Sequence, residues 1–400
     1  TGVAFNSNEV KKGYIFFAFK GSSTDGNLFI KDAIQNGSKV IISDKIKKTG
    51  IKNNILFLSA KNPRKLLSQI SSKIFNKKPK NLIAVTGTNG KSSIANFYFQ
   101  ILKLNKIKVA SIGTLGIHGI NIRNKFSNTT LDTIQVNKIL QKLKEKKIEN
   151  VILEASSHGL NQNRLDGLKF DVGIFTNLSR DHLDYHKTFR DYLNSKLKLF
   201  NKLLSHKGNM IFEDSIKEAV ILNKIAKKKG LKKYTLGNSK SFIVIKNVKK
   251  INDKKKIDFT INKKNYSFET SLIGDVQIKN LMLAIVAAYL SGIKISNIIK
   301  SIHKIKTIRG RLEKVGNLKN RARVILDYAH TPHALKTLIL DIKKEFPLSK
   351  VSLVFGCGGN RDENKRSMMG TIAKKYCNDI YLTDDNPRFE SPELIRNQVK

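Results

Sequence analysis

Residues 86–93 combine the residue types of a phosphate-binding loop. They read Thr86-Gly-Thr-Asn-Gly-Lys-Ser-Ser93, after an apolar run at 81–85 and before a helical pattern. Backbone N–H groups of such a loop bind phosphates, Lys91 can reach the terminal phosphates and Ser92 can bind Mg²⁺. Val85 stands where a strict Walker A loop has its first glycine. We expect the nucleotide to contact Gly87, Thr88, Asn89, Gly90, Lys91, Ser92 and Ser93.

Two further apolar runs end in residues that could bind a metal ion. Glu154 ends the run at 151–154, and His182 follows the run at 170–176, with acidic residues at 181 and 184 beside it. An isolated glutamate or histidine at a strand end is often only structural. Because parallel strands bring their carboxyl ends to one edge of a sheet, both residues should lie beside the phosphate loop, which favours metal binding.

Lys196 is an unusual residue for its position. Apolar side chains at helical spacing fill one arc of the predicted helix at 189–204, and Lys196 falls near the middle of that arc. A lysine there must extend to solvent, pair with an acid or be chemically altered. The residues alone leave these alternatives open.

Polar segments also follow three predicted strands in the last hundred residues. They read Leu326-Asp-Tyr-Ala-His-Thr-Pro332, Phe355-Gly-Cys-Gly-Gly-Asn-Arg-Asp362 and Thr383-Asp-Asp-Asn-Pro-Arg388. The glycine turn is weak by itself, but three polar strand ends in one sheet favour a ligand site at their common edge.

The elements that must position these residues predict an α/β protein of three domains, at 1–79, 80–307 and 308–400. A polar, proline-bearing linker at 76–80 separates the first two. The second domain combines buried parallel strands with a small antiparallel sheet between about 231 and 270 and a helix at 280–290. The third repeats strand and helix in the manner of a Rossmann-like parallel sheet. Its predicted elements lie at 322–328, 332–346, 350–355, 365–376 and 379–383.

The charge is strongly positive, with 75 Lys and Arg against 31 Asp and Glu and a formal net charge of +44. This excess raises the possibility of nucleic-acid binding. The lysines are spread along the whole chain, however, without zinc-finger spacing or interleaved aromatic and basic residues. We therefore expect no nucleic-acid partner. Six of the 13 arginines lie at the motifs, namely Arg164, Arg180, Arg311, Arg361, Arg366 and Arg388.

The chain has no apolar run long enough for a membrane span, no signal-peptide pattern and only two cysteines, Cys357 and Cys377, so a cytoplasmic location is expected. It opens with Thr1, and residues 391–400 begin a helix without a C-cap signal. We expect a fragment cut at both ends, which by itself binds nucleotide weakly.

Together these motifs resemble the Mur ligases, the ATP-dependent enzymes that add amino acids during peptidoglycan synthesis. The resemblance covers nearly the whole chain, and the ordered set of motifs is highly specific. Besides the phosphate loop it rests on Asn128-Thr-Thr130, Glu154-Ala-Ser-Ser-His-Gly-Leu-Asn-Gln-Asn-Arg164, Thr176-Asn-Leu-Ser-Arg-Asp-His-Leu-Asp-Tyr-His186, Gly310-Arg311, Asp327-Tyr-Ala-His-Thr-Pro332 and Asp385-Asn-Pro-Arg388.

The resemblance implies a role for each matching residue. Lys91, Glu154, His182 and Lys196 would be catalytic, with Lys196 carbamylated, and Mg²⁺ would be bound by Ser92, Glu154, His182 and Lys196. ATP would also contact Asn280, Arg311, Asp327 and His330. The UDP-muramoyl-dipeptide would contact Ser7, Thr129, Thr130, Ser156, Gln162 and Arg164, and the incoming amino acid would contact Arg361, Asp385, Asn386 and Arg388.

The implied reaction adds meso-diaminopimelate to UDP-N-acetylmuramoyl-L-alanyl-D-glutamate through an acyl phosphate, in a monomer that uses ATP and Mg²⁺. In this family the Asp-Asn-Pro-Arg form is associated with meso-diaminopimelate. A guanidinium can hold the distal carboxylate of that substrate through two hydrogen bonds, whereas a lysine substrate would meet like charge.

The sequence departs from the family pattern at Asn6-Ser7-Asn8, where the family has Asp-Ser-Arg, and at Gln277, where asparagine is common. Another Mur ligase or a folylpolyglutamate synthase is the alternative within the superfamily. Either should lack the Ser-Ser-His-Gly and Asp-Asn-Pro-Arg segments. A nucleic-acid-stimulated ATPase is the alternative from another class of protein.

Overall fold

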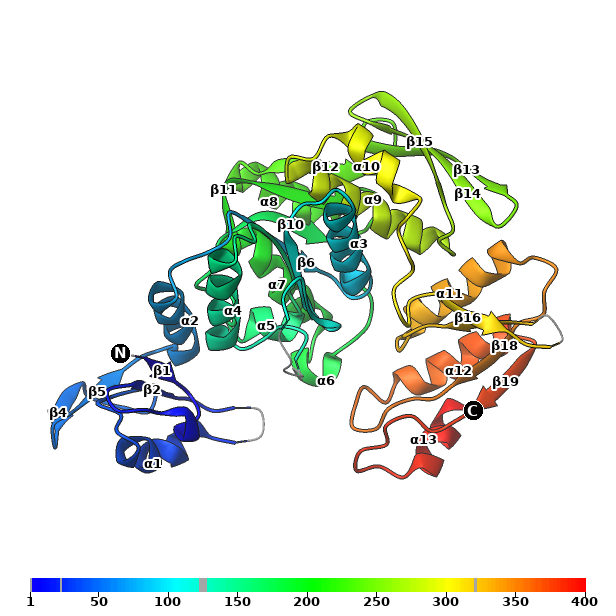
Figure 1. Cartoon of the computed structure of the whole chain (residues 1–400). Helices are drawn as coiled ribbons and strands as arrows, with labels where there is room; N and C mark the ends of the chain where they lie inside the picture. The colour runs from blue at the N-terminus through cyan, green and yellow to red at the C-terminus, as the bar shows by residue number, and fades with distance from the viewer. Residues whose placement is uncertain (1, 22–23, 122–127, 320–321) are drawn as a thin grey trace.

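The computed structural model describes residues 2–21, 24–121, 128–319 and 322–400 as an α/β protein with three lobes (Figure 1). The elements of the N-terminal lobe are β1 (Val3–Ala4), η1 (Ser7–Glu9), β2 (Ile15–Ala18), η2 (Gly26–Phe29), α1 (Ile30–Gln35), β3 (Val40–Ser43), β4 (Gly50–Lys52), β5 (Ile55–Ser59) and α2 (Pro63–Ile74). The sheet has the order β1-β2-β3-β5-β4 and is parallel except for β4. Short apolar segments form β2, β3 and β5, and the predicted linker at 76–80 forms no helix or strand.

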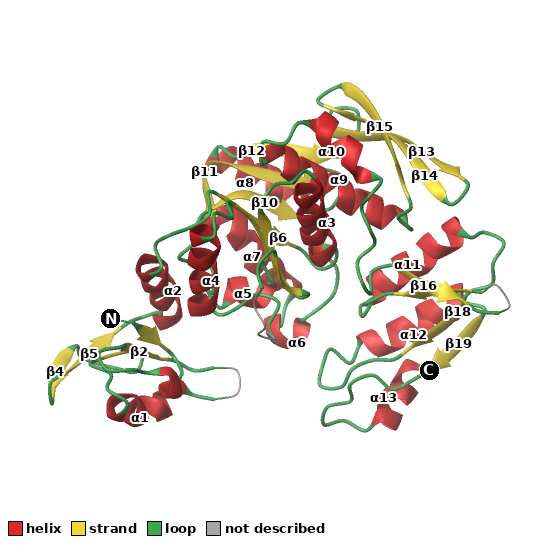
Figure 2. Ribbon diagram, in the orientation of Figure 1, coloured by secondary structure: helices red, strands yellow, loops and turns green. Residues whose placement is uncertain are grey.

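The central lobe contains a sheet of ten strands with helices on both faces (Figure 2). Its elements before residue 231 are β6 (Asn81–Thr86), α3 (Lys91–Leu104), β7 (Val109–Gly113), β8 (Gly116–His118), α4 (Thr133–Glu145), β9 (Asn150–Glu154), α5 (Ser157–Asn161), β10 (Phe170–Phe175), α6 (Leu183–His186), α7 (Phe189–Lys198), η3 (Leu199–Leu203), β11 (Leu204–Glu213) and α8 (Ala219–Lys229). Strands β6, β7, β9, β10 and β11 are parallel.

The apolar sequence of β6 follows from burial on both faces of the sheet. Leu82 and Ala84 pack with the side chains of α4 and α8, whereas Ile83 and Val85 pack with α3 on the opposite face. The edge where β6, β9 and β10 end carries Glu154 and the phosphate loop, as the parallel arrangement predicts.

The region 231–270 contains the predicted antiparallel strands, but they do not form a sheet of their own. It forms β12 (Lys232–Leu236), β13 (Ile243–Ile251), β14 (Lys254–Ile261) and β15 (Lys264–Thr270), followed by α9 (Asp275–Leu290) and α10 (Ile295–Ile302). Strand β12 runs parallel to β11, so the antiparallel β13–β15 extend the central sheet rather than forming one of their own. The free edge of β11 makes this continuation possible.

The predicted helix at 189–204 is also shorter than expected. The α-helix α7 ends at Lys198, and the chain continues as the π-helical turn η3 before β11 starts at Leu204. Lys196 lies before the change and its side chain is buried, as the helical pattern predicted.

The C-terminal lobe contains β16 (Glu313–Asn317), β17 (Arg323–Leu326), α11 (Pro332–Glu345), β18 (Ser352–Phe355), α12 (Lys365–Tyr376), β19 (Asp379–Leu382) and α13 (Pro392–Val399). The helix predictions hold, but the three predicted strands do not share one ladder. In the described residues β17 pairs antiparallel with β16, whereas β18 and β19 pair in parallel. Residues 313–317 carry no alternating apolar pattern, so no strand beside β17 was predicted there.

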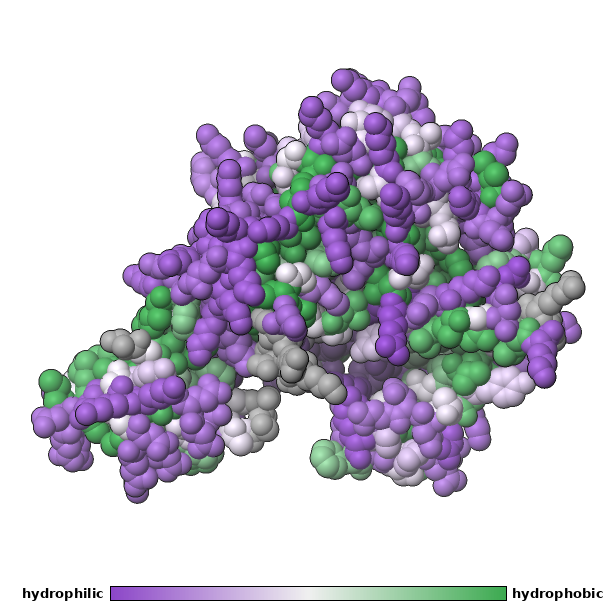
Figure 3. Space-filling model, in the orientation of Figure 1, coloured by the Kyte–Doolittle hydropathy of each residue, from purple (hydrophilic) through white to green (hydrophobic). Residues whose placement is uncertain are grey.

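Hydrophilic residues cover most of the face of the central lobe that Figure 3 shows. Among the lysines that the structure describes, three, Lys196, Lys255 and Lys365, are buried, and the other described lysines are at least partly exposed to solvent. None of the described helices is long and apolar enough to cross a bilayer.

Candidate functional site

A cleft of about 410 Å³ lies between the phosphate loop and the C-terminal lobe. Residues from α9 and from the segments after β9, β10 and β17 complete its wall. The predicted site residues that line it are Thr88, Asn89, Gly90, Lys91, Ser92, Ser93, Thr129, Glu154, His182, Asn280, Arg311, Asp327, His330 and Arg361. The structure therefore brings almost the whole predicted ATP set to one cavity.

The phosphate loop is held by Asn177, the second residue after β10. Asn177 accepts from the backbone N–H of Thr88 (2.9 Å) and, through its side chain, from the backbone N–H of Asn89 (3.0 Å). The side-chain amide nitrogen of Asn89 is buried without a hydrogen-bond partner. An unpartnered buried donor is costly, and a phosphate oxygen would satisfy it, so the loop fits a nucleotide.

Two lysines donate to the same carbonyl oxygen of this loop. The Nζ of Lys91 lies 3.0 Å and the Nζ of Lys196 lies 2.7 Å from the Gly87 oxygen, and Lys91 also donates to the Thr88 oxygen at 2.8 Å. Burial lowers the pKa of Lys91, which Glu154 and Asp181 oppose. Burial, and then the charge of Lys91, lower the pKa of Lys196 well below its ordinary value.

Gly90 is required at the start of α3. Its φ of +88° is in the left-handed region, and a Cβ there would lie 2.7 Å from the Oδ1 of Asn280. Gly90→Ala is expected to weaken binding of a non-hydrolysable ATP analogue by about ten-fold, because strain of about 1–3 kcal/mol adds to the clash. Isothermal titration would measure this change.

Gly292→Ala is the matched control for that substitution. Gly292 has a similar φ of +91°, but nothing lies within 4 Å of its missing Cβ. It should lower the thermal midpoint through strain alone and leave analogue affinity unchanged. Equal losses of affinity in both variants would contradict the assigned role of the Gly90 contact.

Glu154 is the centre of an oxygen-rich group at the end of β9. Its carboxylate accepts from the Ser92 hydroxyl (3.0 Å), the Thr114 backbone N–H (3.0 Å) and the Thr114 hydroxyl (3.1 Å). Gly113 leaves room for this carboxylate, because a Cβ at that position would collide with it. Side-by-side hydroxyl and carboxylate oxygens suit Mg²⁺, which prefers such ligands together with phosphate oxygens.

The four predicted metal ligands are not one contact group. Ser92 and Glu154 touch, His182 lies 3.2 Å from Asp181, and Lys196 contacts the Gly87 oxygen behind the loop. No group of three His, Cys, Asp or Glu in the described ranges could hold a metal ion by itself. Mg²⁺ would therefore need phosphate oxygens as ligands, in addition to these side chains.

His182 is half-buried beside aromatic rings. Its ring centroid lies 4.8 Å from that of His158 and 6.2 Å from that of Tyr192. Burial lowers the pKa of His182 to about 3, although the Asp181 carboxylate opposes the shift. The imidazole is thus neutral at physiological pH, which is the form that can coordinate a metal ion.

The residues predicted to hold the muramoyl-dipeptide form a second group beside α5. The Thr130 hydroxyl donates to the Glu154 backbone oxygen (2.8 Å) and to the Ser156 hydroxyl (3.0 Å). The Arg164 guanidinium donates to the Gln162 side-chain oxygen (2.7 Å) and the Thr130 backbone oxygen (2.5 Å). These four residues are therefore one hydrogen-bonded cluster next to Glu154.

Ser7 and Thr129 are placed differently. Thr129 lines the cleft, and its hydroxyl lies 3.0 Å from that of Thr114. Ser7 is buried in the N-terminal lobe, where its backbone oxygen accepts from Asn36 (3.0 Å). Asn6 caps the short η1 turn by accepting from Asn8, which gives the departing Asn6-Ser7-Asn8 segment a local structural role.

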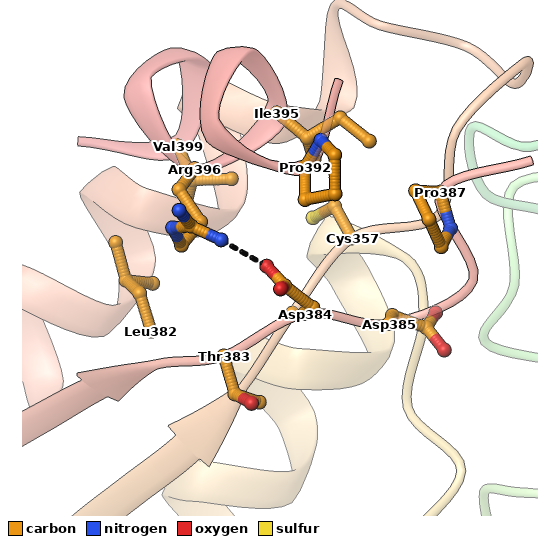
Figure 4. A pocket seen from close by; sticks show the side chains of 11 residues that line it. Cys357, Leu382, Thr383, Asp384, Asp385, Pro387, Pro392, Ile395, Arg396 and Val399 are labelled. Carbon is orange, nitrogen blue, oxygen red and sulfur yellow. Dashed lines mark hydrogen bonds and ion pairs between the residues drawn. The ribbon is translucent and has the colours of Figure 1, made fainter. Parts of the chain in front are cut away.

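The predicted amino-acid residues in the C-terminal lobe lie on the turns after β18 and β19. Arg388 has a φ of +54°, and its guanidinium donates to the Gly359 oxygen at 2.5 Å. In Figure 4 Asp385 points away from the Asp384–Arg396 ion pair, so Asp384 is engaged by Arg396 and Asp385 is not. The cavity drawn there has a volume of only about 10 Å³, room for about one water molecule. It is too small for an amino acid.

The remaining predicted ATP residues are fixed on the side of the C-terminal lobe. Asp327 accepts from the backbone N–H groups of Leu312 (2.7 Å) and Ala329 (2.8 Å), and burial raises its pKa. Gln277, one of the departures from the family pattern, donates to the Arg311 backbone oxygen (3.3 Å), and its own side-chain oxygen is buried without a partner.

Several cleft residues were not among the predicted site residues. Thr114 binds Glu154, Asp181 lies between His182 and His330, and Tyr328 stacks with Arg311. Asp181 and Tyr328 belong to the motif segments, so the sequence already indicated that they could lie near the site. Thr114 follows a buried strand that ends in glycine, and this was the only sequence feature that could have indicated its place in the cleft.

This fold and cleft define an α/β enzyme that uses a nucleotide between a phosphate loop and a second lobe. Three family models match the chain. They are the Mur ligase family, catalytic domain (residues 1–81), the Mur ligase middle domain (85–288) and the Mur ligase, glutamate ligase domain (310–400). The chain belongs to the Mur ligase family and is an ATP-dependent ligase that forms C–N bonds.

Named relatives agree with this assignment. A Rickettsia montanensis protein named UDP-N-acetylmuramoyl-L-alanyl-D-glutamate–2,6-diaminopimelate ligase is 40% identical over 403 residues, covering 100% of this chain and 82% of the relative. A Brucella melitensis protein of the same name is 36% identical, covering 100% and 81%. A solved structure of a ligase with that name has a TM-score of 0.75 at 29% identity, covering 100% and 81%. The MurF ligase from Thermotoga maritima in complex with ADP (TM-score 0.66, 18% identity, covering 100% and 86%) shares the fold.

Proposed function

We propose that this cytoplasmic, monomeric ligase adds meso-diaminopimelate to UDP-N-acetylmuramoyl-L-alanyl-D-glutamate in peptidoglycan synthesis. The single observation that carries the proposal is the cleft, which places Lys91 and Glu154 opposite Arg361 of the C-terminal lobe. The names of the relatives support the choice of substrates. We also propose domain limits at 79/80 and 307/308.

The reaction requires two polyanions to approach one another. The glutamyl carboxylate of the dipeptide attacks the γ-phosphorus of ATP, which forms an acyl phosphate and releases ADP. The amine of the amino acid then attacks the acyl carbon, and phosphate leaves. Lys91 neutralises phosphate charge, and the Thr130–Arg164 cluster orients the dipeptide beside Glu154. Positioning and electrostatic stabilisation account for the rate enhancement, and no protein nucleophile is needed.

Mg²⁺ fits the oxygen group at the end of β9, with Ser92 and Glu154 as its nearest protein ligands and His182 in the same cleft. When bound, it would offset the negative charge that develops on the phosphate oxygens. Lys196 would contribute as a carbamate, whose carboxylate replaces a cation. Arg361, Asp385, Asn386 and Arg388 would bind the zwitterionic end of the amino acid.

A panel of amino acids in a phosphate-release assay tests the proposal. Release is expected only when ATP, the UDP-muramoyl-dipeptide and an amino acid are all present. meso-Diaminopimelate should give a kcat/KM at least about 100-fold above that of L-lysine, because the lysine ammonium would meet Arg388. Release that rises with polynucleotide and ignores the dipeptide would instead indicate a nucleic-acid-stimulated ATPase.

A further inference from the structure

Arg180 and Asp362 form an ion pair between the central and C-terminal lobes. The Nε of Arg180 lies 2.9 Å from Oδ2 of Asp362, and its Nη2 lies 3.3 Å from Oδ1, so the contact has two hydrogen bonds. The Asp362 side chain is 7% exposed and that of Arg180 39%. Such paired geometry at a partly buried carboxylate is the kind of ion pair that contributes measurably.

The neighbouring residues pair across the same boundary. Arg361 lies 3.8 Å from Asp184, and the His330 ring lies 3.5 Å from Asp181. Arg361 and Asp362 have opposite charges, and each faces the opposite charge on the segment that follows β10 and includes α6. A shift of one residue would place like charges together, so these contacts fix the register of the loop before α12.

Neither Arg180 nor Asp362 lines the cleft, whereas Arg361 does. The ion pair is therefore outside the volume that ATP and the amino acid would occupy. The direct effect of the ion pair is on the position of Arg361, the residue next to Asp362. Among the described residues, the other ion pair between the central lobe and the loop from β18 to α12 is Arg361–Asp184, whereas the His330–Asp181 contact comes from the segment after β17.

We propose that Arg180 and Asp362 are positioning residues whose ion pair holds Arg361 against the cleft, where it meets the incoming amino acid. This inference rests on the proposed function, because the role of Arg361 belongs to it. The inference adds a specific contact, the Arg180–Asp362 ion pair. Through this contact, the position of the amino-acid site depends on the segment that carries Asp181 and His182.

The test is a charge exchange in the enzyme. Arg180→Asp and Asp362→Arg are each expected to raise the KM for meso-diaminopimelate by about ten-fold, since a charged hydrogen-bonded pair is lost. The KM for ATP should stay within about two-fold. The double variant, which restores opposite charges, should recover most of the loss. A purely structural role would instead lower the thermal midpoint of the single variants and leave the KM for meso-diaminopimelate unchanged.

Arg190→Gln is the matched control, because Arg190 is an exposed arginine on α7 with no ion pair in the part of the chain described. It should leave both KM values unchanged. If the exchanged variants fail to fold, Arg180→Lys and Asp362→Asn keep the size of each side chain and should give smaller increases of the same kind. Unchanged KM values in these variants, or a double variant no better than the singles, would overturn the proposal.

Amide hydrogen exchange separates this proposal from the proposed function. The single variants should increase the exchange rate of the segment between β18 and α12 in the ligand-free protein, and the double variant should reverse that increase. Wild-type enzyme that lacks dipeptide- and amino-acid-dependent phosphate release would refute the proposed function, while hydrogen exchange would still show whether the ion pair orders this segment. Identical exchange of this segment in all variants would refute the positioning role.

Discussion

Lys196→Ala is expected to lower kcat for ligation by about 100- to 1000-fold, the effect of removing one group that stabilises transition-state charge. Lys196 is 1% exposed, and its Nζ lies 4.3 Å from the centroid of the Tyr192 ring. Because its pKa is well below the ordinary value, more of the amine is unprotonated at neutral pH. Only an unprotonated amine can add CO₂ to form a carbamate.

Phosphate release at saturating substrates would measure the loss. Added acetate or formate should restore part of the activity, because a free carboxylate can occupy the space of the missing carbamate. Carbon-13 NMR with labelled bicarbonate should show a carbamate signal in the wild type and not in Lys196→Ala. Lys202→Ala, which removes an exposed lysine from η3, is the control. A fully active Lys196→Ala variant would refute the role.

Arg388→Lys should raise the KM for meso-diaminopimelate by about 100-fold, because a point charge cannot replace a guanidinium that holds a carboxylate through two hydrogen bonds. The positive φ of Arg388 sets the direction in which this side chain starts, and the contact of its guanidinium with the Gly359 oxygen holds its end between the two turns. Steady-state kinetics with each substrate varied in turn would show the effect.

Arg396→Lys is the control for that substitution. Arg396 lies in the same lobe but pairs with Asp384, on the other side of the turn from Asp385 (Figure 4). Its replacement should leave the KM for meso-diaminopimelate near the wild-type value. ATP affinity should be unchanged in both variants. An unchanged KM for the amino acid in Arg388→Lys would count against the assigned contact.

Much of the cleft could be predicted because its residues follow parallel strands. Glu154 and the phosphate loop end neighbouring strands, and the rule that such ends share one edge places them together. The burial of Lys196 followed from helical periodicity, which is a local property of the sequence.

The rest depended on contacts between distant segments. Arg180 and Asp362 are 182 positions apart, and no periodicity connects them. Strand β12 joins β11 because that edge is free in the folded sheet, and the sequence of residues 231–270 alone gives equal support to a separate sheet. Likewise, the change from α-helix to π-helix after Lys198 depends on the position at which β11 begins.

The carbonyl oxygen shared by Lys91 and Lys196 has a consequence for the stability of the protein. The amine of Lys196 is buried and that of Lys91 is partly buried before any nucleotide arrives. The free energy needed to dehydrate them is thus part of folding, and ATP does not have to supply it on binding. The phosphate loop therefore presents a prepared binding surface, and the central lobe is less stable as a result. This is a trade-off between stability and activity.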